Sequence, residues 1–379
     1  MASRFGFIST YPPTQCGLAT FTASLMGALQ AGRDGCRVAR LLETPHPAGG
    51  PEFVTDLIAG DPRSRTQSLD RLNGCDVVVV QHEFGIFGGP DGDEVLLLLA
   101  GLRVPTIVVL HTVLTEPTRH QREVLEAVVA GAGAIVTMTS TARRRLLTGY
   151  HVNPDKVRVI AHGAAERFGA DSDPSVATPG QRPTVLTWGL LGPGKGIEWG
   201  IEAMALLTDR HPAAQYLVAG QTHPKVRARD GEGYRQGLQR RIEALSLAGS
   251  VHLDGRYLDD STLAALVAAA DVVLLPYDST EQVTSGVLIE AVAAGKPVVA
   301  TRFPHALELL SDGAGIVVPH RDPVGIADAL ARVIGSDEVA AAMSRAASAT
   351  APGLRWSAVA GQYRLLADRL IAQAGRAAA

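Results

Sequence analysis

A glycine-rich loop with a single lysine lies near the middle of the sequence. The segment from Thr187 to Met204 reads TWGLLGPGKGIEWGIEAM, which predicts a strand, a loop and a helix. Such loops present backbone N–H groups and a helix N-terminus to phosphate oxygens. Lys195 adds a full positive charge, so we predict a diphosphate site from Gly189 to Lys195. The structural alternative is a tight turn with a solvated lysine.

A second candidate segment runs from Asp271 to Thr301 and again passes from a strand through a polar loop into a helix. Thr284 or Ser285 would cap that helix, which leaves the N–H groups of Gly286 and Val287 as a second anion site. Glu290 then falls among apolar residues, where a carboxylate needs hydrogen-bond partners. Paired ribose hydroxyls would supply them, whereas a solvent-facing glutamate is the alternative.

Three positions in the first half follow predicted strands. Gly17 opens a helix directly after the first strand, where a glycine permits close approach of a phosphate. His111 ends the predicted strand TIVVLH. His82 and Glu83 end the predicted strand VVVVQHE, and we expect these two residues to bind an acceptor. A loop glycine and structural histidines are the alternatives. The dinucleotide fingerprint GxGxxG is absent, which counts against a dehydrogenase.

Short β-branched runs alternate with longer amphipathic segments along most of the chain, as in parallel α/β sheets. The pattern predicts two tandem doubly wound domains, whose ligands bind beyond the carboxyl ends of the strands. We expect strands at Phe5–Ser9, Val77–Gln81, Thr106–Leu110, Ala134–Met138, Val157–Ile160, Thr184–Trp188, Gln215–Ala219, Val251–Leu253, Val272–Leu275, Pro297–Ala300 and Gly315–Val318. Residues 1–168 form the first predicted domain, 169–183 a linker and 184–355 the second domain.

The C-terminal segment has an apolar helical face. Its apolar residues recur at spacings of three and four: Trp356, Val359, Tyr363, Leu366 and Leu370. We expect residues 356–379 to form a helix that crosses back to the first domain.

Composition excludes several classes of protein. With 46% hydrophobic residues, 19% charged residues and a net charge of −3, the chain is neither disordered nor a nucleic-acid binder. No apolar run reaches the roughly 18 residues of a membrane span, and the N-terminus lacks a signal peptide's apolar region. Three unevenly spaced cysteines suggest neither disulfides nor zinc, so we expect a cytoplasmic protein. Asp91 and Asp93 are interpreted as turn residues, and no metal is predicted.

With these residues identified, the chain resembles the family 4 retaining glycosyltransferases (glycosyl transferase group 1), over nearly its whole length. The family's GRxxxxKG loop is similar to Gly189–Gly196, and its ExxxxxxxE element falls on Gln282–Glu290. AxxxGxPVVAT follows from Ala291 to Thr301. The glycine at Gly17, the histidine at His111 and VIAHG at Val159–Gly163 extend the resemblance.

This resemblance implies the GT-B fold, in which two Rossmann-like domains enclose a cleft, and a metal-independent hexosyltransferase. The co-substrate would be a GDP- or UDP-hexose and the acceptor a carbohydrate or glycoconjugate. Lys195 would neutralise the donor diphosphate, Glu290 would hold the ribose, and His111 would contact the sugar near its reacting carbon. Backbone groups from Ser285 to Val287 would meet phosphate or sugar.

Two positions depart from the family pattern. Leu190 stands where the family has Arg, and Gln282 stands at the first Glu. Arg256 is a candidate for the missing charge, and Gln282 retains hydrogen-bonding capacity toward sugar hydroxyls. Two alternatives remain open: a protein of this fold that binds a nucleotide sugar without transferring it, and a sugar-nucleotide epimerase.

Overall fold

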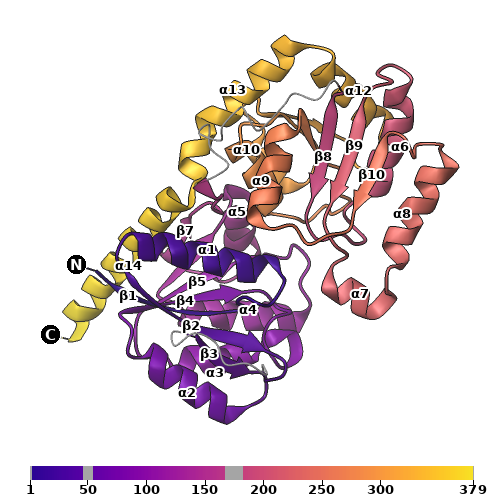
Figure 1. The fold of residues 1–379 in the computed structure, drawn as a ribbon. Coiled ribbons are helices and arrows are strands. Elements are labelled where there is room, and N and C mark those ends of the chain that lie inside the picture. The colour runs from indigo at the N-terminus through magenta and orange to yellow at the C-terminus, as the bar shows by residue number, and fades with distance from the viewer. Residues whose placement is uncertain (1, 46–53, 167–181, 379) are drawn as a thin grey trace. The chain divides into compact units, whose positions relative to one another are not determined.

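A computed structural model describes residues 2–45, 54–166 and 182–378. The chain divides into two compact units, which are described separately here. The first contains residues 1–163 and 356–379, and the second contains residues 164–355. In Figure 1 the first unit carries the indigo and purple segments together with the yellow C-terminal helix.

The first unit is built on a parallel sheet of seven strands in the order β3-β2-β1-β4-β5-β6-β7. The strands are β1 (Arg4–Ser9), β2 (Gly35–Leu42), β3 (Val54–Ile58), β4 (Val77–His82), β5 (Thr106–Leu110), β6 (Ala134–Thr137) and β7 (Val157–Val159). The chain moves outward from β1 to β3 and then returns to β4 on the other side of β1. The topological switch point therefore lies between β1 and β4, where doubly wound sheets bind their ligands.

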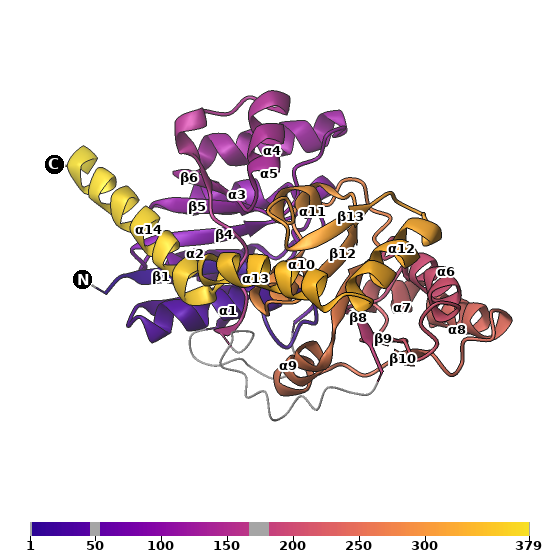
Figure 2. The same ribbon diagram turned by 90° about the horizontal axis from the view of Figure 1, so that it is seen from above.

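Helices cover both faces of this sheet. They are α1 (Gly17–Ala31), α2 (Pro62–Leu72), α3 (Glu94–Gly101), α4 (Arg119–Gly131), α5 (Ser140–Gly149) and α14 (Trp356–Ala378), with short 3₁₀ turns η1 (Pro90–Gly92) and η2 (Pro154–Lys156). The helices α1 and α14 pack side by side on one face, and α2 and α3 lie on the opposite face (Figures 1 and 2). Most strand residues are apolar on both faces because both are covered.

The second unit has a parallel sheet of six strands in the order β10-β9-β8-β11-β12-β13. Its strands are β8 (Thr184–Trp188), β9 (Gln215–Ala219), β10 (Val251–Asp254), β11 (Val272–Leu275), β12 (Val298–Thr301) and β13 (Gly315–Val318). Its helices are α6 (Ile197–Thr208), α7 (Pro224–Asp230), α8 (Gly233–Ala244), α9 (Asp260–Ala269), α10 (Gly286–Ala293), α11 (Pro304–Leu309), α12 (Pro323–Ile334) and α13 (Asp337–Leu354). The switch point here lies between β8 and β11.

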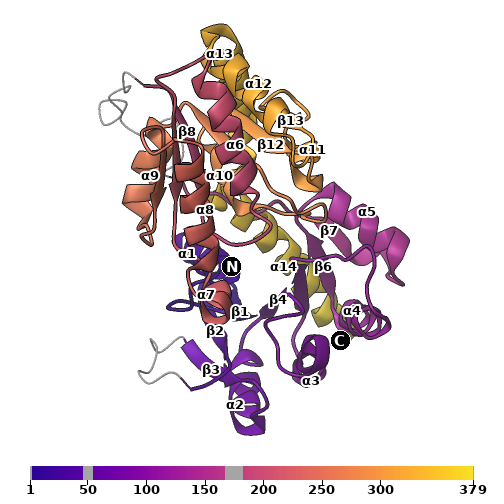
Figure 3. The same ribbon diagram turned by 90° about the vertical axis from the view of Figure 1, so that its right-hand side faces the viewer.

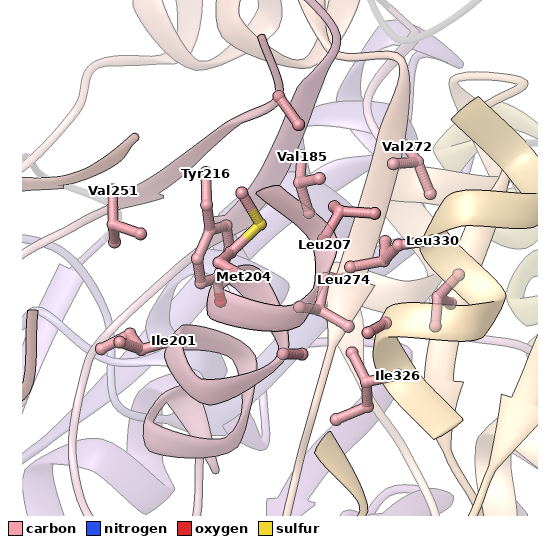
Figure 4. Close-up of a cluster of buried hydrophobic side chains, with 14 of the residues drawn as sticks. Val185, Ile201, Met204, Leu207, Tyr216, Val251, Val272, Leu274, Ile326 and Leu330 are labelled. Carbon is pink, nitrogen blue, oxygen red and sulfur yellow. The ribbon is translucent and has the colours of Figure 1, made fainter. Parts of the chain in front are cut away.

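The core of the second unit lies between its sheet and the helices α6, α8 and α12. Helices α6 and α12 pack against one another on this face (Figure 3). Ile201 and Met204 from α6 belong to the same buried cluster as Ile326 and Leu330 from α12 and strand residues such as Leu274 (Figure 4). This packing fixes the direction in which α6 leaves the loop that precedes it.

The predicted α/β class and the two doubly wound sheets are confirmed. The prediction missed β2 and β3, and these strands extend the first sheet beyond β1. Arg37 and Arg40 interrupt the apolar pattern of β2, and Arg40 is buried because Asp56 of β3 accepts its hydrogen bonds.

The domain boundary falls at Gly163, before the predicted residue 168, because Ala164 donates its N–H to the carbonyl of Leu354 in the second unit. Most of the predicted linker, residues 169–181, lies outside the described residues. No helix among the described residues has both the length and the apolar character needed to span a bilayer.

The C-terminal helix α14 belongs to the first unit. Trp356, Val359, Tyr363 and Leu366 from the expected apolar face join the same buried cluster as residues of α1 and β1. Arg364 donates to Asp34 at 2.6 Å, which ties the exposed side of α14 to the turn after α1. The helix α14 therefore covers part of one face of the first sheet.

Replacing Tyr363 tests this packing. Its side chain is fully buried, and its hydroxyl has no partner among the described residues. Tyr363→Ala should destabilise the first unit by about 3–5 kcal/mol through a cavity, whereas Tyr363→Phe should change stability by less than about 1 kcal/mol because it removes an unsatisfied group. Calorimetric unfolding of both variants measures this. Equal destabilisation by both would show that the hydroxyl has a partner.

Candidate functional site

The loop after β8 turns sharply before α6 begins. Gly189 has a φ of +118° and Gly196 a φ of +61°, which only glycine adopts easily. A Cβ on Gly196 would lie 1.8 Å from the carbonyl oxygen of Pro276, so a larger residue has no room. The predicted glycine loop is therefore pressed against the end of the neighbouring strand β11.

Asp278 joins the two loops at this switch point. Its N–H donates to the carbonyl of Gly194 at 3.0 Å, and its carboxylate accepts from Trp199 Nε1 at 3.0 Å. Arg321 also donates to that carboxylate, at 3.2 Å. The glycine loop after β8 is thus anchored to the segment after β11 on one side and to the first turn of α6 on the other.

Lys195 projects from this anchored loop. Its Nζ lies 4.4 Å from the centre of the Tyr277 ring, within the range of a cation–π contact. Tyr277 itself is buried and stacks on Phe303, with the ring centres 5.1 Å apart. The buried ring of Tyr277, supported by Phe303, therefore holds Lys195 at the switch point without neutralising its charge.

Helix α10 begins beside the same loop. Ser285 accepts a hydrogen bond from the N–H of Leu288 at 3.3 Å and is the N-cap, as predicted. The N–H of Ser285 donates to Nδ1 of His305 at 2.8 Å. A Cβ on Gly189 would lie 3.6 Å from Val287, so the first turn of α10 is adjacent to the glycine loop. The two predicted anion sites therefore meet.

Glu290 points back toward the end of β8. Trp188, the last residue of that strand, donates its indole N–H to Glu290 Oε2 at 3.1 Å. Glu290 as a whole is half-buried, which agrees with neither a fully solvated surface residue nor a sealed core residue. Trp188 fixes one of its oxygens at the carboxyl edge of the sheet.

The two departures from the family pattern occupy the edge of this arrangement. Leu190 lies within the glycine loop, and Gln282 donates its amide N–H to the carbonyl of Thr284 at 3.0 Å. Arg256 follows β10, two strands away from β8, where Asp254 accepts from its guanidinium at 2.6 Å. The charge of Arg256 is thus already balanced within its own loop.

The first unit gathers histidines at the carboxyl ends of its central strands. His111 Nε2 lies 2.7 Å from Gln81 Oε1, and the rings of His111 and Phe21 form a T-shaped contact with their centres 5.1 Å apart. Phe21 also contacts His162 and Trp356. Burial, followed by the proximity of His162 and His82, lowers the pKa of His111 to about 3, so this imidazole is neutral at neutral pH.

The other predicted residues of the first unit lie at its switch point. Gly17 begins α1, is exposed, and has open space where a Cβ would be placed. His82 is buried between Phe84 and Phe87, and both ring nitrogens lack a partner among the described residues. Burial lowers its pKa to about 4. Glu83 accepts a hydrogen bond from Thr112 and stays half-buried.

Sequence reasoning missed Gln81, Trp188, Tyr277 and His305. Each side chain contacts a predicted site residue across two different strands or helices, so the contact is not visible in local spacing. Among the described residues, no three His, Cys, Asp or Glu side chains are grouped as a metal would require. Asp91 accepts hydrogen bonds from His120 and Gln121.

These two doubly wound sheets have the GT-B fold. Residues 182–336 match the family model for glycosyl transferases group 1. The chain is similar to solved structures of Anabaena HepE with UDP (TM-score 0.77, 17% identity, 97% of this chain and 100% of that one). It is also similar to a sucrose-phosphate synthase from Thermosynechococcus elongatus (TM-score 0.78, 19% identity, 98% of this chain and 100% of that one).

Curated relatives agree with this class. A D-inositol 3-phosphate glycosyltransferase of Corynebacterium glutamicum is 28% identical over 71% of this chain and 68% of its own length. An alpha-D-kanosaminyltransferase of Streptomyces kanamyceticus is 28% identical over 60% of this chain and 58% of its own length. The chain thus spans about three fifths to two thirds of these relatives. The matches to the group 1 family model and to these relatives agree with the resemblance that the motifs predicted.

Gly196 and Gly17 provide a matched pair of tests for the loop geometry. Gly196→Ala should destabilise the second unit by more than the roughly 1–2 kcal/mol of a left-handed residue, because its Cβ also meets the Pro276 carbonyl. Gly17→Ala should alter stability by less than about 0.5 kcal/mol, since its site is open. Thermal unfolding measures both. An unfolding temperature for Gly196→Ala equal to that of the wild type would contradict the close packing against β11.

Proposed function

We propose that this protein transfers a hexose from a nucleoside-diphosphate sugar to a hydroxyl of a carbohydrate or glycoconjugate, with retention of anomeric configuration. One observation carries the proposal: the glycine loop with Lys195 and the N-terminus of α10 are adjacent at the switch point, where Val287 lies against Gly189. Two sources of N–H groups and one cation together match a diphosphate.

Each donor group has a proposed residue. Lys195 neutralises the diphosphate, and the N–H groups of Gly286 and Val287 bind its oxygens. Glu290 accepts hydrogen bonds from the ribose hydroxyls, oriented by its contact with Trp188. We also propose that Arg256 and Gln282 contact the donor. The base of the donor is uracil or guanine, and the crystal structure of Anabaena HepE contains UDP.

The reaction needs no dedicated protein base. The bond between the anomeric carbon and the diphosphate oxygen breaks as the acceptor oxygen bonds to the same face of that carbon. The acceptor proton passes to the departing diphosphate, whose charge Lys195 and the helix N-terminus stabilise. His111 is neutral and contacts the donor sugar, while Gly17 allows a phosphate close to α1.

The acceptor is proposed to bind in the first unit, near His82 and Glu83. Glu83 and Thr112 are already hydrogen-bonded to one another, and such a pair is suited to sugar hydroxyls. The name of one relative, a D-inositol 3-phosphate glycosyltransferase, supports a polyhydroxylated ring as acceptor. We also propose a cytoplasmic site of action, supported by three free cysteines.

Lys195→Met tests the proposed function directly. Loss of one preorganised charge should lower turnover roughly 10²- to 10³-fold, measured as nucleoside diphosphate released from candidate donors in the presence of acceptor. Arg210→Met is the matched control, because Arg210 pairs with Asp328 at the far end of α6. Activity within twofold of the wild type would remove Lys195 from the site.

Transfer should also persist in excess EDTA, because Lys195 and the α10 N-terminus supply the positive charge that a divalent metal supplies in other transferases. The same release assay with and without chelator measures this. Loss of activity that is restored by a divalent cation would overturn metal independence and return attention to Asp91 and Asp93.

A further inference from the structure

Gln81 is a fully buried amide in the middle of the first sheet. It is the second-to-last residue of β4 and lies opposite Val109 of β5. The N–H of His111 donates to the carbonyl of His82 at 3.0 Å, which continues the ladder between β4 and β5 by one residue. The backbone therefore places Gln81 and His111 on the same face of the sheet as diagonal neighbours at the carboxyl edge.

The contact between these side chains restricts the chemistry of His111. Gln81 Oε1 lies 2.7 Å from His111 Nε2, and a carbonyl oxygen only accepts hydrogen bonds. Nε2 must then carry the proton of the neutral ring, which leaves a lone pair on Nδ1. Among the described residues Nδ1 has no hydrogen-bond partner, and it is not one of the polar atoms that the fold closes off from solvent.

The fold by itself does not explain an amide at residue 81. Its Nε2 atom is buried without a partner among the described residues. An unsatisfied buried donor costs about 1–3 kcal/mol, and an apolar side chain of similar size would avoid that cost. Within the described parts of the chain, the hydrogen bond that Gln81 makes to another side chain is the one to His111.

We propose that Gln81 is a positioning residue that holds His111 as the Nε2–H tautomer, so that Nδ1 accepts a hydrogen bond from a hydroxyl of the donor sugar. This inference rests on the proposed function, because His111 is assigned there to the donor sugar. In this state His111 neither donates a proton from Nδ1 nor acts as an acid. His111 then favours donor sugars that carry a hydroxyl within hydrogen-bond distance of its Nδ1 atom.

The tautomer is measured without any substrate. Long-range proton–nitrogen NMR spectra of protein labelled at its histidines distinguish the two ring nitrogens, and the His111→Gln variant assigns the signal. We expect the Nε2–H form in the wild type and a mixture of tautomers in Gln81→Leu. Gln81→Glu should retain the Nε2–H form, because a carboxylate also accepts. A wild-type Nδ1–H tautomer would overturn the proposal.

The effect on transfer is measured separately. Gln81→Leu should lower kcat roughly 10- to 100-fold, as for other residues that orient a functional histidine, with little change in the KM of the acceptor. Gln81→Glu should recover part of that loss. Gln215→Leu is the matched control, because Gln215 makes the same amide contact, at 2.9 Å, with the exposed His252.

The two readouts separate this inference from the proposed function. If the wild type transfers no sugar, the proposed function fails while the tautomer spectra still test the contact. If the wild type is active and Gln81→Leu shifts the tautomer without lowering kcat, the positioning role is overturned. Equal losses in Gln81→Leu and Gln81→Glu, with unchanged tautomers, would likewise overturn it.

Discussion

The carbonyl oxygen of Pro276 lies where any side chain at residue 196 would have to be. This close approach brings the loop after β8 against the end of β11, and the hydrogen bond between Asp278 and Gly194 keeps it there. Two other features of the second switch point depend on that constraint. Lys195 is placed over Tyr277, and the loop meets the first turn of α10.

The two units meet the same topological requirement with different chemistry. In the second unit, the residues at the switch point are a cation, glycines and the start of a helix, which suits an anionic ligand. In the first unit, burial keeps the imidazoles neutral, and the pKa values of His82 and His162 are lowered to about 4. Neutral rings, an amide and a half-buried glutamate suit hydroxyl groups rather than phosphates.

The C-terminal helix shows how a distant segment contributes to a candidate site. Trp356 packs directly against Gly163, where a Cβ would lie 2.1 Å from its ring. Its ring also makes a T-shaped contact with Phe21, with the ring centres 4.9 Å apart, and Phe21 makes the same kind of contact with both His111 and His162. The last helix of the chain therefore supports the histidines of the first unit through one shared aromatic side chain, and it does so in addition to covering the sheet.

Much of the molecule could be predicted from local pattern. Strands such as Thr184–Trp188 and Gly315–Val318 were predicted with their observed bounds, because buried parallel strands are short, apolar and bounded by turn residues. The glycine loop, the Ser285 cap and the family motifs are also local features. The strand β2 was missed because its buried Arg40 depends on Asp56, a partner in another strand. Sequence alone thus determined the fold class, the resemblance to a family and the candidate residues. Only the tertiary structure decided their partners: Trp188 for Glu290, Tyr277 for Lys195, and Gln81 for His111. Each of these contacts joins residues on separate strands, helices or loops, and side-chain contacts between such elements are set by packing rather than by spacing along the chain.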